Sequence, residues 1–375
     1  MNTRNKGKGL KCVILLCGLI FMTPKNVAAQ GQPPGVLSGF GLQVTQQLST
    51  NVADFPAIST TPGLTFRYDP QTQLFERTTA PLGPVFVERA RTVGQGKFEF
   101  GVSYLFIDFD NLNGNDVEDF GGPAQNTPGV ELSIDKFKLH SHIIPFFVTY
   151  GITDRWDVNL LLPIVSTSFN SRISLRVGPV NLLFADSNNS TGAGDLRLRT
   201  KYRLVSVGES FHVAVGSSMR FPSGSESDIH GSGDYILEPF LAVSQEYRRF
   251  HLHLQTGFDF NFDDSDRNRF RYSGGFEVDL LEQLGLTVDI IGSSSLKKDQ
   301  VTGEIPMLGG PPPPPGVPAP PSSFRTPVKT DIVDLGVGLR GNWGPVTGFI
   351  TFFVPITDDG LRADFIPAGG LQVSF

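Results

Sequence analysis

The chain has 375 residues, a mean hydropathy near zero and a net charge of −6, from 31 basic and 37 acidic residues. No stretch reaches the ~20 consecutive apolar residues that a transmembrane helix needs, so a membrane protein built of helices is excluded. The acidic excess argues against nucleic acid as a partner.

Residues 1–29 have the pattern of a secretory signal peptide. A basic start precedes an apolar run from Cys12 to Met22, and Val27-Ala28-Ala29 supplies small residues for cleavage before Gln30. Both cysteines, Cys12 and Cys17, lie in this segment, so the mature chain is expected to have no disulfide. Loss of the five basic residues of the signal leaves 26 basic against 37 acidic residues, a net charge of −11.

Residues 30–95 are rich in Pro, Thr, Gln and Gly, and they show little periodicity. We expect an irregular segment that either stays in the periplasm or enters the lumen of the domain that follows. The sequence leaves open whether it acts as a plug.

Residues 96–375 alternate apolar and polar side chains at period 2, which is typical of strands with two different faces. In 251–262, for example, His251 and His253 oppose Leu252 and Leu254. A soluble sandwich also alternates, but its apolar face packs on a second sheet. Here the apolar face is rich in aromatic residues, whereas the polar face combines Gly with charges of both signs. That pattern predicts a transmembrane antiparallel up-and-down β-barrel with lipid outside and water inside.

The links between the strands support this fold class. Twelve strands are expected near 97–109, 133–150, 154–169, 194–205, 209–221, 234–247, 250–261, 270–281, 284–295, 331–342, 345–355 and 365–375. Long links alternate with short ones, as in bacterial barrels with long outer loops, tight periplasmic turns and periplasmic termini.

Three segments within this region have their own interpretation. Residues 173–184 either add a hairpin or stay in the second outer loop, and 345–355 is apolar on both faces, so its register is open. The run Pro311–Pro315 predicts an extended spacer in the fifth outer loop. At the end of the chain, an alternating strand carries the expected C-terminal assembly signal: Leu371, Val373 and Phe375.

Charged side chains on the predicted inward faces are the candidate functional residues. The expected basic lining consists of Lys136, Lys138, His140, His142, Arg197, Arg199, Lys201, Arg203 and Arg220. The expected acidic lining consists of Glu238, Asp259, Glu277, Asp279, Asp289 and Asp334. Two opposed walls of this kind would polarise the passage of solutes. The alternative is that the charges pair with one another and fill a narrow interior.

No arrangement for catalysis or tight metal binding stands out. The sequence contains no Gly-x-Ser-x-Gly or Cys/His pattern, and no phosphate-cradling loop, so we predict neither an enzyme nor a cofactor. Twelve-stranded phospholipases keep the enzyme alternative open. The pairs His140/His142 and His251/His253 offer two ligands each, fewer than a tight metal site needs, so no metal is predicted.

Four groups of short motifs stand out along the chain: Gly83–Ala90 with Gly96–Tyr104, Tyr150–Asp157, Gly192–Leu198 with Lys201-Tyr202-Arg203, and Phe221–Gly224 before Gly231-Ser232-Gly233. These motifs resemble those of the bacterial family of the MetA pathway of phenol degradation. The resemblance covers roughly residues 83–375. It implies an outer-membrane barrel with a role in uptake of aromatic or hydrophobic compounds, but it carries over no substrate-binding residues.

We therefore predict a barrel of the bacterial outer membrane that passively admits small solutes, with the hydrophobic or aromatic class coming from the resemblance. Its expected partners are membrane lipid, the barrel-assembly machinery and the solutes. The alternative is a barrel without transport activity that serves a structural or adhesive role.

Overall fold

The computed structural model describes residues 52–55, 59–60, 66–69, 74–77, 86–112, 114–117, 121–123, 130–177, 179–208, 210–297, 299–304, 323–328 and 331–374. The predicted signal peptide, the run Pro311–Pro315 and Phe375 lie outside these residues. In the described part of the chain, no helix is both long and apolar enough to cross a membrane.

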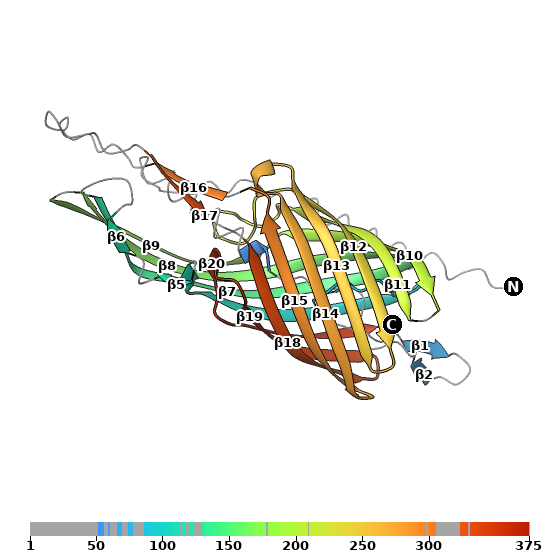
Figure 1. Ribbon diagram of the computed structural model, residues 1–375. Helices are drawn as coiled ribbons and strands as arrows, with labels where there is room; N and C mark the ends of the chain where they lie inside the picture. Colours follow the sequence, from blue (N-terminus) through green and yellow to red (C-terminus); the bar gives the residue numbers. More distant parts are fainter. Residues whose placement is uncertain are drawn as a thin grey trace. The chain divides into compact units, whose positions relative to one another are not determined.

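Twelve antiparallel strands form a closed barrel (Figure 1). They are β3 (Phe98–Phe109), β7 (Val130–Thr153), β8 (Trp156–Val177), β10 (Leu196–Val207), β11 (Phe211–Phe221), β12 (Ile236–Tyr247), β13 (Phe250–Asn261), β14 (Arg269–Leu281), β15 (Leu284–Ser295), β18 (Ile332–Trp343), β19 (Val346–Pro355) and β21 (Ile366–Ser374). Each strand pairs with the next one in this order. The last strand, β21, pairs with the first, β3, from Ala368 opposite Leu105 to Ser374 opposite Glu99.

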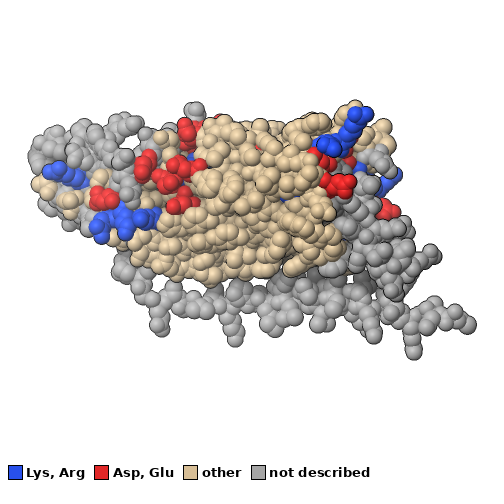
Figure 2. All heavy atoms as spheres, turned by 90° about the horizontal axis from the view of Figure 1, so that it is seen from below, with Lys and Arg blue, Asp and Glu red and all other residues tan. Residues whose placement is uncertain are grey.

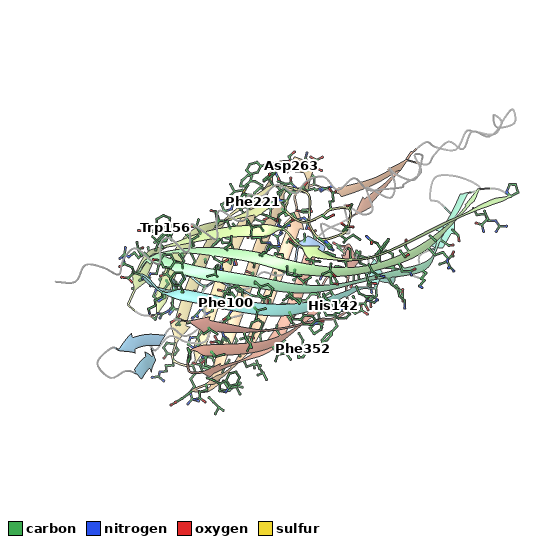
Figure 3. The ribbon with its side chains drawn as sticks, turned by 180° about the vertical axis from the view of Figure 1, so that it is seen from behind. Phe100, His142, Trp156, Phe221, Asp263 and Phe352 are labelled. Carbon is green, nitrogen blue, oxygen red and sulfur yellow. The ribbon has the colours of Figure 1, made fainter. Side chains whose placement is uncertain are left out.

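The predicted order of long and short links is confirmed. Links of two or three residues join β7 to β8, β10 to β11, β12 to β13, β14 to β15 and β18 to β19, and we call the end of the barrel that carries them the short-turn end. The opposite end carries the long connections and is called the loop end. Figure 3 shows Trp156 near the first of these ends, and Phe221 and Asp263 near the second.

The loop-end connections contain additional short elements. They are β4 (Asn111–Leu112), β5 (Asn115–Asp116), β6 (Gly121–Pro123), the 3-10 turn η2 (Ser265–Arg267), β16 (Asp299–Glu304), β17 (Ser323–Val328) and β20 (Leu361–Arg362). Strands β16 and β17 pair with each other, and β20 pairs with β4. A separate hairpin near the N-terminus consists of β1 (Phe66–Asp69) and β2 (Leu74–Arg77).

Strands β7 and β8 are about twice as long as their neighbours β3 and β10. The sequence left open whether residues 173–184 add a hairpin or stay in the second outer loop, and the structure shows a hairpin. Strand β8 continues to Val177, and β9 (Val180–Ala193) returns along it. The segment that was expected as an outer loop, 170–193, is therefore mostly strand. Together, β7, β8 and β9 continue beyond the loop end as a three-stranded extension (Figure 1).

The two faces of the strands differ as expected for a membrane barrel. On β13, Phe250, Leu252 and Leu254 point outward and are 46–50% exposed, whereas His251 and His253 point inward and are at most 2% exposed. On the face seen in Figure 2, a broad band without charged side chains separates charged groups toward the two ends. Such a band suits the hydrocarbon interior of a bilayer.

Inward-facing glycines are covered by aromatic rings from neighbouring strands. A Cβ at Gly101 would lie 2.2 Å from Cζ of Phe147, and a Cβ at Gly216 would lie 2.3 Å from Cζ of Phe240. Aromatic cover of this kind fixes strand register and permits curvature of a sheet. The narrow interior therefore needs glycine at these positions.

We expect Gly101→Ala to destabilise the barrel by about 1–3 kcal/mol, because the added methyl group forces the buried ring of Phe147 to move. The temperature at which the folded band converts to the unfolded band in gel electrophoresis measures the effect. Gly274→Ala is the matched control, since its Cβ meets only a flexible methyl group of Leu254 at 3.3 Å and a carbonyl at 3.9 Å. Equal conversion temperatures for the two variants would contradict this role of Gly101.

Candidate functional site in the barrel interior

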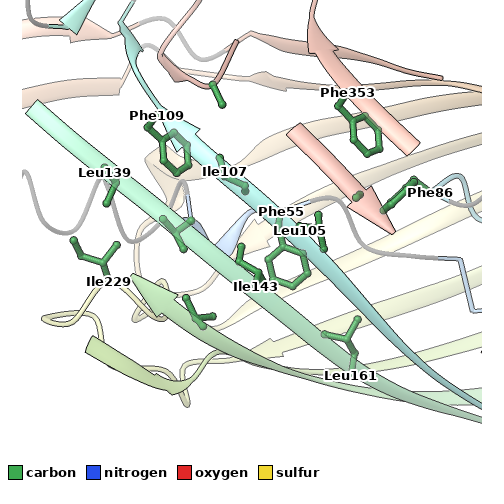
Figure 4. Packing of buried hydrophobic residues seen from close by; sticks show 14 of the residues in the cluster. Phe55, Phe86, Leu105, Ile107, Phe109, Leu139, Ile143, Leu161, Ile229 and Phe353 are labelled. Atoms are coloured by element: carbon green, nitrogen blue, oxygen red, sulfur yellow. The ribbon is translucent and has the colours of Figure 1, made fainter. Parts of the chain in front are cut away.

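Parts of the N-terminal segment lie inside the barrel. We call residues 52–55, 59–60 and 86–93 the plug residues. Phe55 and Phe86 are each 5% exposed and pack against inward side chains of β3, β7, β8 and β19 (Figure 4). The ring of Phe86 lies 5.9 Å from that of Phe349 and 4.7 Å from that of Phe353, both edge to face. The inward apolar side chains of β19, whose register was open, therefore face the plug.

One carboxylate of the plug, Asp54, binds three arginines of the barrel wall. Arg220 and Arg269 donate to it over 3.1 and 3.0 Å, and Arg271 donates to the same carboxylate. Burial alone would raise the pKa of Asp54, but the three guanidinium groups outweigh it and hold the pKa below the usual range. Asp54 is consequently an ionised anchor near the loop end.

A second carboxylate, Glu88, is anchored on β10. Lys201 Nζ donates to Oε1 over 2.7 Å, and Arg199 Nη2 donates to Oε2 over 2.8 Å. Thr60 adds its backbone N–H at 3.0 Å and its hydroxyl at 2.5 Å. Burial opposes ionisation of Glu88, which is fully buried, yet the two cations lower its pKa to about 2.

The remaining plug residues approach the short-turn end. Arg91 forms a two-pronged ion pair with Glu246 of β12 at 2.7 and 2.6 Å. The backbone N–H of Ala90 donates to Ser244 over 2.9 Å, and that of Val93 donates to Asp157 over 3.0 Å. The contacts of the plug thus extend along much of the barrel.

A cavity of about 150 Å³ lies between the plug and the loop end. One side of its lining is apolar, and it includes Phe55, Phe86, Ile107, Phe109, Ile291 and Leu361. The other side is polar, and it includes Arg197, Arg199, Arg220, Glu238, Gln255 and Arg271. The loop-end pair Arg362–Asp334 also borders it. A small molecule in this cavity would meet apolar carbon on one side and guanidinium groups on the other.

The structure brings most of the predicted lining residues together on the inner face. Buried there are Arg197, Arg199, Lys201, Arg220, Asp259, Glu277 and Asp289. Glu238, Asp334 and Asp279 share this face and are partly exposed, and half-buried Arg203 donates to the carbonyl of Asp154 near the short-turn end. The inward charged side chains named here are basic on β10 and β11 and acidic on β12, β13, β14, β15 and β18.

The prediction is wrong for the four residues of β7. Lys136, Lys138, His140 and His142 occupy its outer face: His142 binds the hydroxyl of outward Tyr104 at 2.8 Å, and the others share its parity. The inward positions of this wall include the apolar residues Leu139 and Ile143, which pack in one buried cluster with Phe55 and Phe86, and the buried hydroxyl residues Ser141 and Thr149. The sequence suggested the opposite register because polar side chains were assumed to face inward throughout.

The carboxylates of the plug are the functional residues that sequence reasoning missed. Asp54 and Glu88 lie in a segment without periodicity, so no strand pattern pointed to them. One signal was available, since a barrel interior with this many arginines needs counter-charges. Among the described residues, no group of three or more His, Cys, Asp or Glu is arranged to hold a metal ion.

The family described as "Putative MetA-pathway of phenol degradation" matches residues 121–308, half of the chain. The chain belongs to this family. Its barrel is of the type that bacteria place in the outer membrane. No curated protein matches the chain.

The similar solved structures include channels and porins, each with low sequence identity to this chain. The COG4313 outer membrane channel from Pseudomonas putida F1 is 12% identical, with a TM-score of 0.49, and the match covers 76% of this chain and 98% of that one. The KdgM porin is 9% identical with a TM-score of 0.40, covering 73% and 99%. A deletion mutant of the TodX monoaromatic hydrocarbon channel is 10% identical with a TM-score of 0.35, covering 76% and 91%.

Proposed function

We propose that this protein is an outer-membrane channel for passive uptake of small hydrophobic or aromatic compounds. The observation that carries the proposal is the cavity inside a closed barrel, lined by aromatic and aliphatic side chains on one side and arginines on the other. The family description, which refers to phenol degradation, supports an aromatic class of solute. The proposal assigns the protein no catalytic role.

The proposal includes a division of the chain and a set of partners. Residues 1–29 act as a signal peptide, 30–95 supply the plug, and 96–375 form the barrel. Lipid tails contact the outward aromatic and aliphatic side chains, and the assembly machinery reads the terminal strand. Outward Leu371, 53% exposed, belongs to that strand.

Passage requires movement of the plug residues, because their contacts cross the interior. A solute that enters from the loop end reaches the cavity first and then meets Phe55 and Phe86. The polar wall beyond them carries Arg199 and Lys201, both bound to Glu88. Local displacement of the plug, with the strands fixed, is the simplest opening step that this arrangement allows.

The same ion pairs favour a second candidate, a barrel without transport activity. Glu88 is buried, the side chain of Asp54 is 12% exposed, and together they bind five basic side chains, which stabilises the filled interior. In this alternative, the plug is a permanent part of the core and the protein has a structural or adhesive role.

Two measurements on the refolded protein decide between the candidates. We expect single-channel events in a planar bilayer, and swelling of liposomes in small aromatic solutes that is faster than in sugars of similar size. Liposomes with a heat-denatured sample are the control for leakage. Silence in the bilayer together with no swelling in any solute would favour the structural role.

A further inference from the structure

The cavity has the size and the two-sided lining of a binding site for one small molecule. Its volume of about 150 Å³ matches the apolar cavities that hold a single benzene ring. Phe55, Phe86 and Phe109 supply aromatic faces and edges, and Ile107 and Ile291 supply aliphatic contacts. This half of the cavity is therefore suited to one flat, apolar ring.

The opposite half has an excess of positive charge. The cavity is lined by five arginines, Arg197, Arg199, Arg220, Arg271 and Arg362, against three carboxylates, Asp54, Glu238 and Asp334. Taken as formal charges, this set has a net charge of +2. A buried excess of this kind favours an anion.

Arg197 is the group in this half that is best placed to bind it. Its side chain is 7% exposed, its guanidinium lies 4.6 Å above the ring centre of Phe55, and its Nη2 donates to the carbonyl of Ala53 over 2.5 Å. Its Nε has no hydrogen-bond partner among the described residues. Buried donors are normally satisfied. Of the arginines whose Nε lacks a partner among the described residues, Arg197 is the one that lines the cavity.

We propose that this cavity binds a single-ring aromatic carboxylate, with the ring against Phe55, Phe86 and Phe109 and the carboxylate toward Arg197. The inference rests on the proposed channel function and narrows its substrate class from aromatic compounds in general to those that carry one negative charge. The carboxylate accepts charge-assisted hydrogen bonds, which a neutral ring cannot do.

The test is calorimetric titration of the refolded full-length protein in detergent with benzoate, benzyl alcohol and acetate. Benzoate has ring and charge, benzyl alcohol only the ring, and acetate only the charge. We expect benzoate to bind about tenfold or more tightly than either of the other two. Equal affinity for benzyl alcohol would overturn the need for charge, equal affinity for acetate would overturn the need for the ring, and absence of benzoate binding would overturn the site.

A variant comparison locates the site. Arg197→Gln is expected to weaken benzoate binding about tenfold and to leave binding of benzyl alcohol unchanged. Arg155→Gln, at an exposed turn at the short-turn end, is the matched control and is expected to bind benzoate normally. The electrophoretic band shift on heating confirms folding of each variant. Unchanged benzoate binding in folded Arg197→Gln would place the anion elsewhere and refute the assignment.

The binding and transport measurements together distinguish failure of the proposed binding site from failure of the proposed channel function. Liposome swelling without benzoate binding would refute the binding site and leave the channel intact. Benzoate binding without conductance or swelling would support the site and refute transport.

Discussion

The double substitution Asp54→Asn and Glu88→Gln is expected to raise the open probability of the channel by on the order of a hundredfold or more. Removal of one partner from a buried charge pair costs about 3–5 kcal/mol, and each 1.4 kcal/mol changes an equilibrium about tenfold. The two carboxylates anchor the plug to Arg199, Lys201 and the arginines around Asp54. Without them, the docked plug leaves those cations unpaired, whereas the displaced plug exposes them to water.

Single-channel recording at constant voltage measures the open probability directly. Asp266→Asn is the matched control, because Asp266 is 61% exposed and pairs on the surface with Lys297, an interaction of little energetic weight. The control is expected to behave as the wild type does. An open probability in the double variant equal to that of the wild type would show that these ion pairs do not hold a gate.

The second large effect concerns ion selectivity. Replacement of Arg197, Arg199 and Arg203 by Glu is expected to shift the channel toward cations, because three inward positive charges along β10 become negative. The reversal potential in a salt gradient of about tenfold reports this shift, and its sign is expected to change. An unchanged reversal potential would show that β10 does not line the ion path.

The outer face of β7 provides the control for this experiment. Lys136 and Lys138 carry the same kind of charge and were predicted from the sequence to face inward. They share the outward face of β7 with His142, on the part of β7 that continues past its last pair with β3. Their replacement by Glu is expected to change the reversal potential far less than the β10 variant does. A change in reversal potential as large as that of the β10 variant would show that the measurement responds to charge outside the barrel interior. It would then give no evidence that β10 lines the ion path.

The strands could be predicted from the sequence because two local signals agree. Period-2 alternation marks each strand, and short polar turns alternate with long connections, as between Tyr247 and Phe250 and between Asn261 and Arg269. Both signals come from the same physical cause, a sheet with lipid on one face and an enclosed interior on the other. Strand limits outside β7 and β8 fall within about two residues of those expected.

The interior could not be predicted to the same extent, because it depends on a segment distant in sequence. Lys138 and His142 were expected to face inward on β7, but the inward positions beside them hold Leu139 and Ile143. These two residues share a buried apolar cluster with Phe55 and Phe86 of the plug. The alternation of apolar and polar residues within β7 does not show which of its two faces is turned inward.

A family motif that the sequence showed has a clear structural role. Asp195, at the start of β10, accepts hydrogen bonds from the backbone N–H groups of Gly224 and Ser232 at 3.1 and 2.7 Å, and from the Ser232 hydroxyl at 2.8 Å. A Cβ at Gly231 would lie 2.3 Å from this carboxylate. Three of the motifs, Gly192–Leu198, Phe221–Gly224 and Gly231-Ser232-Gly233, thus meet at Asp195, which holds the loop between β11 and β12 next to the start of β10.

The three-stranded extension changes which part of the protein meets the surroundings of the cell. At about 3.4 Å per residue, the 24 residues of β7 span about 80 Å of strand, against about 40 Å for the 12 residues of β3. The additional length of β7, with β8 and β9 paired alongside, extends beyond the loop end of the barrel. Bacterial barrels turn their long connections outward, and with that orientation the extension is exposed to a bacteriophage or an antibody at the cell surface. Substitutions at its end, far from the cavity, would change such contacts without changing the barrel interior.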